Sequence, residues 1–215
     1  MKLELKKELP LIGIVLAPLV YLAVIWKNLP EKVPMHWDYN GQIDRWGEKH
    51  TLIITVFFFT IFLYVLMLII PKIDPKKRLE VMGGKFYQLK FILLLFFSGL
   101  ALIIVNISKN ESLSNPGLIN AFIGFLFIAL GNYFKVIQPN YFIGIRTPWT
   151  LESKEVWKST HTFSGKLWML GGLIIVLSGF LLSNELIKYS LISMMVIIVF
   201  VPILFSYLKF KQIEK

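Results

Sequence analysis

The stretch that decides the fold is Thr-Leu-Ile-Ile-Thr-Val-Phe-Phe-Phe-Thr-Ile-Phe-Leu-Tyr-Val-Leu-Met-Leu-Ile-Ile at positions 51–70, which has no charged side chain. A bilayer core of about 30 Å needs roughly 17–25 apolar helical residues to cross it. Backbone amides in lipid must be hydrogen-bonded within their own segment, so such stretches form helices. The sequence predicts an all-α integral membrane protein with six transmembrane helices, since five more uncharged apolar stretches occupy positions 9–26, 91–107, 118–134, 167–183 and 189–208.

Composition agrees with a multi-pass protein of the cell membrane. The chain is 56% hydrophobic with a mean hydropathy of +0.66, whereas soluble domains are about 45–50% apolar. The first stretch contains Pro18 and no small-residue cleavage site before Lys27, so we expect a retained helix rather than a signal peptide. The chain has no cysteine, which excludes disulfides and thiolate metal ligands.

The net charge of +10 is distributed in a way that predicts topology. Of the 23 Lys and Arg residues, 17 lie in segments 1–8, 71–90, 135–166 and 209–215, and 6 lie in the alternate segments. Cytoplasmic loops carry such an excess of basic residues, so we expect both termini in the cytoplasm. The same charges attract anionic lipid headgroups, and we expect no direct binding of nucleic acid.

We expect one six-helix membrane domain over residues 1–215. Its N-terminal region, 1–70, contains an outer loop at 27–50, and its region 118–208 contains an inner loop at 135–166. Long loops follow the first and fourth helices, as expected for two three-helix halves of inverted topology. This pattern favours an alternative function, that of a small membrane transporter or lipid-handling protein.

Two inner segments have helical periodicity. Between helices 4 and 5, residues 153–168 predict an interfacial amphipathic helix that runs into the fifth span. His161 falls at the edge of its polar face, as an ordinary interfacial residue. Asp74-Pro75 predicts a helix start, and Gly83-Gly84 weakens the short amphipathic helix that follows. We expect the basic segment that contains this helix, residues 71–90, either to lie on the inner leaflet or to dock a cytoplasmic partner.

The predicted spans contain no charged residue, which disfavours an ion path or a proton relay. Polar residues in the spans, including Asn106 and Asn120, are expected to join helices.

The outer loop allows three interpretations. His36, Asp38, Asp44 and His50 would supply imidazole and carboxylate ligands to a divalent metal, although their spacing matches no metal motif. Tyr39-Asn40-Gly41 favours a turn. The remaining interpretations are a peptide-binding surface and a loop that only folds.

The sequences of the two loops resemble motifs of known protein families. Leu29-Pro-x3-Pro-x-His-Trp-x3-Gly followed by Asp44 is similar to a domain of unknown function near the N-terminus of many bacterial membrane proteins. Asn140-Tyr-Phe-Ile-Gly-Ile-Arg-Thr-Pro-Trp-Thr-Leu, followed by Val156-Trp157 and Thr160-His161, resembles the signature of the SdpI immunity-protein family. The resemblance implies protection against a hydrophobic peptide toxin and capture of a cytoplasmic repressor protein at the membrane.

The resemblance also implies two sets of binding residues. The outer set is Pro34, His36, Trp37, Gly41 and Asp44. The inner set is Asn140, Gly144, Arg146, Thr147, Pro148, Trp149, Trp157 and His161. The Arg146 guanidinium would grip a carboxylate or phosphate, or anchor to lipid phosphate beside Trp149. We expect no catalytic residue, cofactor or metal, and therefore no enzyme, because the sequence offers no nucleophile–base pair.

Overall fold

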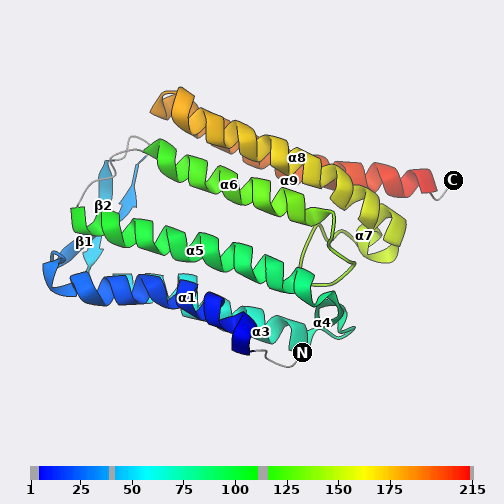
Figure 1. The fold of residues 1–215 in the computed structure, drawn as a ribbon. Helices are drawn as coiled ribbons and strands as arrows, with labels where there is room; N and C mark the ends of the chain where they lie inside the picture. Colours follow the sequence, from blue (N-terminus) through cyan, green and yellow to red (C-terminus); the bar gives the residue numbers. More distant parts are fainter. Residues whose placement is uncertain (1–4, 39–41, 111–115, 214–215) are drawn as a thin grey trace. The chain divides into compact units, whose positions relative to one another are not determined.

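The computed structural model describes residues 5–38, 42–110 and 116–213, which form two compact units. The first unit comprises Met1–Ile70 and Tyr87–Asn115, and the second comprises Pro71–Phe86 and Pro116–Lys215. Six helices are long and apolar enough to cross a membrane, and each unit carries most of three of them (Figure 1). The six predicted transmembrane helices are confirmed. The single domain and the cytoplasmic termini stay predictions.

The first unit contains three long helices and a short hairpin. The second long helix is continuous but includes a π-helical turn, η2. The elements in chain order are α1 (Leu5–Ile25), the 3-10 turn η1 (Trp26–Asn28), β1 (Lys32–Trp37), β2 (Ile43–Glu48), α2 (Thr51–Phe57), η2 (Phe58–Phe62), α3 (Leu63–Ile73) and α5 (Gly84–Asn110).

The outer loop folds into the antiparallel hairpin β1–β2, an element that the all-α prediction lacked. Lys32 pairs with Glu48 and Pro34 with Trp46, and the register shifts between Pro34 and His36. A proline within a short run disfavours a strand, and this obscured the hairpin in the sequence. The structure places Pro34 beside an irregularity, where the missing N–H is tolerated. The turn predicted at Tyr39-Asn40-Gly41 lies outside the described residues.

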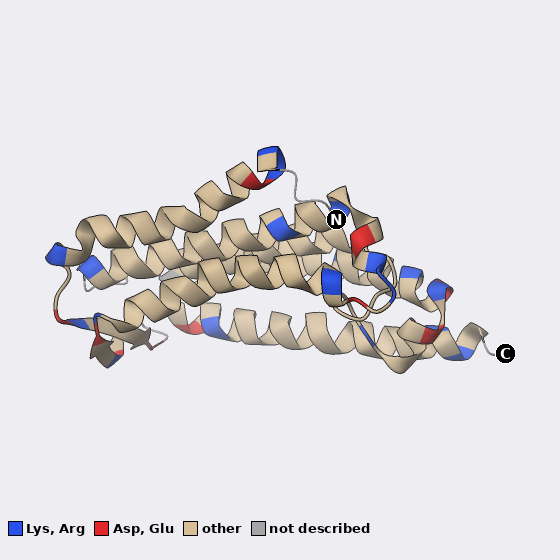
Figure 2. Cartoon of the chain, turned by 90° about the horizontal axis from the view of Figure 1, so that it is seen from below, with Lys and Arg blue, Asp and Glu red and all other residues tan. Residues whose placement is uncertain are grey.

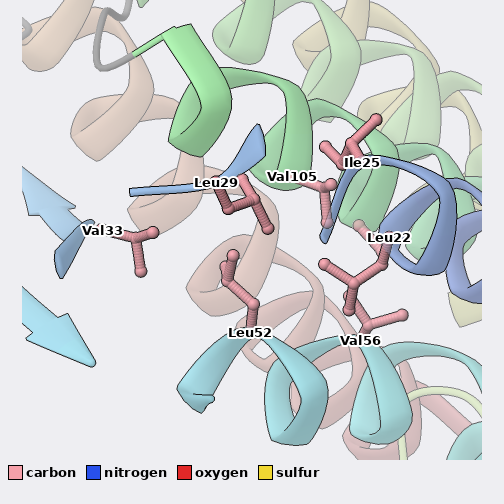
Figure 3. Close-up of a cluster of buried hydrophobic side chains, with 8 residues drawn as sticks. Leu22, Ile25, Leu29, Val33, Leu52, Val56 and Val105 are labelled. Atoms are coloured by element: carbon pink, nitrogen blue, oxygen red, sulfur yellow. The ribbon is translucent and has the colours of Figure 1, made fainter. Parts of the chain in front are cut away.

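A buried apolar cluster ties the hairpin to the helices of the first unit. Val33 of β1 is fully buried and belongs to the same cluster as Leu29, Leu52 and Val105, which come from the loop, α2 and α5 (Figure 3). Since each side chain removed from solvent favours folding, the cluster fixes where β1 leaves the helix ends.

The second unit packs three long helices side by side and adds two short ones (Figure 1). Its elements are α4 (Arg78–Met82), α6 (Pro116–Phe134), α7 (Pro148–Glu152), α8 (Lys154–Leu181) and α9 (Asn184–Ile213). The predicted amphipathic segment is the first part of α8 and continues without a break into the fifth span. Its interfacial position stays a prediction. The helix predicted after Asp74-Pro75 is interrupted at Gly83, whose φ is +51°.

Helices α6 and α8 meet along a ladder of glycines. Gly117, Gly124 and Gly131 recur every seven residues in α6, opposite Gly179, Gly172 and Gly165 of α8. A Cβ at Gly124 would lie 2.6 Å from the Gly172 carbonyl oxygen, and one at Gly131 would lie 2.7 Å from that of Gly165. In lipid, where apolar surface alone does not drive association, such close backbone approach supplies much of the packing.

Side-chain amides join helices in both units, as expected. Asn120 of α6 donates to the Ile175 carbonyl of α8 at 2.8 Å, and the Asn106 side-chain oxygen accepts from the Tyr21 hydroxyl at 3.2 Å. An amide in lipid finds no water, so a partner on the next helix stabilises the pair.

Charged residues lie mostly towards the ends of the helices (Figure 2). The predicted spans themselves carry no charge, but two of the helices extend beyond them and bring two buried charges together. Glu8 in α1 and Lys90 in α5 form a buried ion pair, with Lys90 Nζ 2.6 Å from Glu8 Oε1 and 2.8 Å from Oε2. The Tyr64 hydroxyl of α3 donates to Glu8 Oε2 at 2.9 Å. Both helices extend beyond the predicted spans, which began one residue after each charge.

Candidate functional site

The inner motif begins with a turn that Asn140 closes. Its side chain is fully buried, and its Oδ1 accepts hydrogen bonds from the backbone N–H groups of Phe142 at 2.8 Å and Ile143 at 2.7 Å. Its Nδ2 donates to the carbonyl oxygens of Gln138 at 2.8 Å and Ile143 at 3.1 Å. The Asn140 side chain therefore forms its hydrogen bonds with the backbone of the loop itself.

His161 is buried under this loop, which corrects its predicted place on the polar edge of the helix. Its Nδ1 lies 2.8 Å from the Trp157 carbonyl oxygen, and its Nε2 lies 3.0 Å from the Ile145 backbone nitrogen. A carbonyl only accepts and an amide N–H only donates, so Nδ1 carries the proton and Nε2 accepts. The imidazole is therefore neutral and acts as a bridge between α8 and the loop.

The other residues of this segment are buried or exposed as expected for an amphipathic helix. Val156, Trp157 and Thr160 are buried, whereas Lys154 and Lys158 are exposed. His161 differs because the loop folds over one edge of the polar face and buries it. The helical periodicity of the sequence gives no information about this contact.

Gly144 fits against His161 and tolerates no side chain. Its φ is +105°, and a Cβ would collide with His161 Nε2. Trp157 supports the opposite side, because its ring stacks on the imidazole with centroids 4.1 Å apart and its Nε1 donates to the Ile137 carbonyl at 2.9 Å. Gly144, Trp157 and His161 thus form one packed unit.

Thr147, Pro148 and Trp149 begin the short helix α7. Thr147 is its N-cap in a capping box with Thr150, and Pro148 occupies the first turn, where its missing N–H costs little. Trp149 Nε1 donates to the Ser206 hydroxyl of α9. The Trp149 ring also meets Tyr207 edge-on at 5.4 Å. These three residues connect the inner loop to α9.

Arg146 differs from the other inner motif residues because it is charged and exposed. One guanidinium nitrogen donates to the Tyr141 carbonyl oxygen, which is its one hydrogen bond within the described part of the chain. The Tyr141 side chain is exposed too, and a hydrogen bond and positive charge from Lys76 hold the pKa of its phenol below the usual range. The loop thus presents the Arg146 cation on its surface, held by the Tyr141 backbone, while the Lys76 ammonium lies over the Tyr141 ring at 5.2 Å.

The structure places the outer set on the hairpin, with Gly41 outside the described residues. Pro34 is buried, and Trp37 is partly buried. His36 Nδ1 lies 2.7 Å from Asp44 Oδ1 across the two strands, and both side chains are about half exposed. A further ion pair, Glu31 with Lys49 at 2.6 Å, closes the base of the hairpin and lowers the pKa of the Glu31 carboxyl.

The outer histidines and aspartates are not assembled as a metal site. Within residues 5–38, 42–110 and 116–213, no three His, Asp or Glu side chains are grouped so as to hold a metal ion. His50 instead packs its ring edge-on against Trp26 at 5.5 Å. The structure brings together His36 and Asp44 as a pair on the hairpin.

Sequence reasoning missed Glu8, Lys90 and Tyr64, and it missed the glycine ladder. The signals were present, since the two charges lie one residue outside the predicted spans and the glycines repeat every seven residues. Only the packing shows that Glu8 and Lys90, 82 positions apart, face each other.

Comparison with known proteins agrees with this architecture. Residues 136–207 match the SdpI/YfhL protein family, and residues 13–69 match the Domain of unknown function (DUF1648). Six membrane-spanning helices with these two loops define a multi-pass protein of the cell membrane. Immunity protein SdpI of Bacillus subtilis (strain 168) is 26% identical over 211 residues, which cover 98% of this chain and 99% of the relative. The chain thus resembles the SdpI-like immunity proteins in sequence over nearly its whole length. No solved structure matches it.

Proposed function

We propose that this protein protects its cell against a membrane-active peptide toxin and binds a cytoplasmic repressor protein through Arg146. The peptide meets the outer hairpin and the adjoining helix ends. The repressor meets the inner loop. The similarity to an immunity protein over nearly the whole chain supports the first part of the proposal.

The observation that carries the second part is that Arg146 is exposed in a loop whose other motif residues make contacts inside the protein. Asn140, Gly144 and His161 are held by contacts inside the protein, whereas Arg146 is exposed next to Tyr141. A guanidinium binds a carboxylate with two parallel hydrogen bonds, so an acidic side chain of the partner suits this position.

A signal between the two sides requires two states with different contacts, because a ligand shifts an equilibrium only by its difference in affinity. Helix α9 offers a route, since Ser206 accepts a hydrogen bond from Trp149 and lies 3.4 Å from the Thr147 hydroxyl. A displacement of α9 along α8 would move α7 and with it Arg146.

Survival of a sensitive bacterium tests the proposal. Cells expressing the chain are challenged with a panel of purified membrane-active bacterial killing peptides, alongside R146A, R146K and the control K72A, which removes another exposed cation. We expect the wild type and K72A to protect, R146A to lose repressor capture in a membrane co-purification, and R146K to recover it in part.

Each result has a clear consequence at equal protein abundance. Repressor capture by R146A at the wild-type level would remove Arg146 from the partner site. Failure of the wild type to protect against every peptide would contradict the immunity function.

The second candidate is a small transporter or lipid-handling protein built from inverted three-helix halves. One observation favours it, namely the division into two compact units that each carry most of three spans. Absence of protection together with uptake of a lipid or solute would favour this candidate.

A further inference from the structure

A cavity of about 490 Å³ opens in the second unit beside α4. Its walls come from α4 and the residues just before it, from the start of α5, from the loop before Asn140 and from the first residue of α8. Four of the eight described lining residues are cations, namely Lys76, Arg78, Lys85 and Lys154, and none of the eight is acidic. Its volume falls in the range of small-ligand sites, which is roughly 300–1,000 Å³.

The wall that carries two of these cations is held in place. Arg78 Nη1 donates to the Pro139 carbonyl at 2.8 Å, which fixes α4 against the loop. The buried carboxylate of Asp74 accepts hydrogen bonds from the backbone N–H groups of Leu79 at 2.9 Å and Lys76 at 3.3 Å. Asp74 therefore anchors the segment through its backbone, and the cationic side chains are presented by an ordered wall.

Positive charge continues past this cavity. A second cavity of about 280 Å³ shares Gln138, Pro139 and Lys154 with the first, and it adds Lys135 and Lys158. The nearest acid on α8, Glu155, lies 3.6 Å from Lys209 of α9. Neither Lys85 nor Lys154 forms an ion pair within the part of the chain that the structure describes. Such a concentration of like charge creates a positive potential that attracts an anion to the space between the side chains.

We propose that this basic cavity is a binding site for a phosphate group, carried by an anionic phospholipid headgroup or by a soluble phosphate compound. Arg and Lys are the usual partners of phosphate oxygens, and basic pockets at the cytoplasmic end of membrane helices bind lipid headgroups. The site lies on segments predicted to face the cytoplasm. Val81 at its rim is 85% exposed, which suits an apolar chain next to the phosphate. The proposal depends on neither the toxin nor the repressor.

Lipid retention tests the proposal on the full chain. The protein is purified in neutral detergent, supplied with phosphatidylglycerol or phosphatidylcholine, and its bound lipid is measured by native mass spectrometry. The test variant is K85Q/K154Q, because Arg78 also supports the loop. The control is K72Q/K166Q, which removes the same charge at two exposed lysines outside the cavity.

We expect the wild type and the control to retain phosphatidylglycerol over phosphatidylcholine, and K85Q/K154Q to bind it at least about tenfold more weakly. K85R/K154R, which keeps both charges, should bind as the wild type does. If K85Q/K154Q unfolds, loss of binding in a folded K85R/K154R would itself contradict the proposal. Equal weakening in K85Q/K154Q and the control would also overturn it, since that result means unspecific attraction.

Competition with inorganic phosphate and pyrophosphate distinguishes the two sources of phosphate. Displacement of the lipid by millimolar pyrophosphate would assign the site to a soluble phosphate compound. Retention of the lipid under the same conditions would assign it to a headgroup. Equal binding of phosphatidylcholine and phosphatidylglycerol, with no binding of pyrophosphate, would overturn the proposal.

Discussion

At the scale of single residues, the ion pair between Glu8 and Lys90 is the most unusual feature of the membrane-spanning helices. The Lys90 side chain is fully buried and that of Glu8 is 5% exposed, so both charges are removed from water. Removing a charge from water is costly, and the pair is tolerated because Tyr64 supplies a further hydrogen bond to Glu8. The Lys90 ammonium also lies over the rings of Tyr64 at 5.5 Å and Tyr87 at 5.7 Å.

This geometry predicts that the two charges depend on each other. We expect E8Q and K90M each to lower the free energy of unfolding by about 3–5 kcal/mol, because each leaves one buried charge without its partner. The double variant E8Q/K90M should recover most of that loss. Thermal unfolding of the four proteins in detergent measures the coupling, and additive losses in the double variant would contradict it.

The reason for each residue type in the inner motif lies in the contacts that the residue makes. Gly144 and His161 are 17 positions apart, and the reason for glycine is the imidazole that occupies the space of its side chain. The sequence identified both residues through a resemblance. It placed His161 at the edge of a polar face, since periodicity describes one helix at a time.

At the scale of elements, the packing of α6 on α8 depends on the absence of side chains at three levels. The contact is reciprocal. A Cβ at Gly172 would lie 2.6 Å from the Gly124 carbonyl oxygen, and a Cβ at Gly124 would lie 2.6 Å from the Gly172 carbonyl oxygen. The nearest atom that each added Cβ would meet belongs to the backbone of the other helix. Backbone atoms cannot rotate out of the way, whereas the end of a flexible side chain can. The two helices must therefore separate if either glycine is replaced.

We expect G124A and G172A each to destabilise the second unit by about 1–3 kcal/mol, because the added methyl group overpacks the contact. The control G13A, in α1, adds the same methyl group where no atom lies within 4 Å. Thermal unfolding of the purified proteins checks the difference. Equal melting temperatures for G124A and G13A would show that the helices do not depend on the ladder.

The element boundaries explain which sequence predictions succeeded. Six apolar stretches predicted six spans, because crossing lipid imposes a length and a composition on each segment by itself. The hairpin escaped prediction because its strands are short and irregular, and Val33 is held by residues of α2 and α5 that are distant in sequence.

At the scale of the whole molecule, the distribution of basic residues predicts that the hairpin faces outwards and that α7 faces the cytoplasm. The chain has no cysteine, so single cysteines report their own positions. In intact cells we expect a membrane-impermeant maleimide to label Q42C and to leave E152C unlabelled. Both positions are exposed, so permeabilised cells serve as the control for reactivity. Labelling of E152C from outside, with Q42C protected, would reverse the topology.

The sequence by itself determined the class of protein, the number of spans and the two loops that carry the family motifs. Those properties depend on local composition, because each helix meets lipid along its own length and the positive charges act segment by segment. Only the tertiary structure decided that His161 is a buried neutral bridge, that Glu8 faces Lys90, and that Lys85 and Lys154 line one cavity. Each of these depends on contacts between residues far apart in the chain, and their energies exist only after the helices have packed.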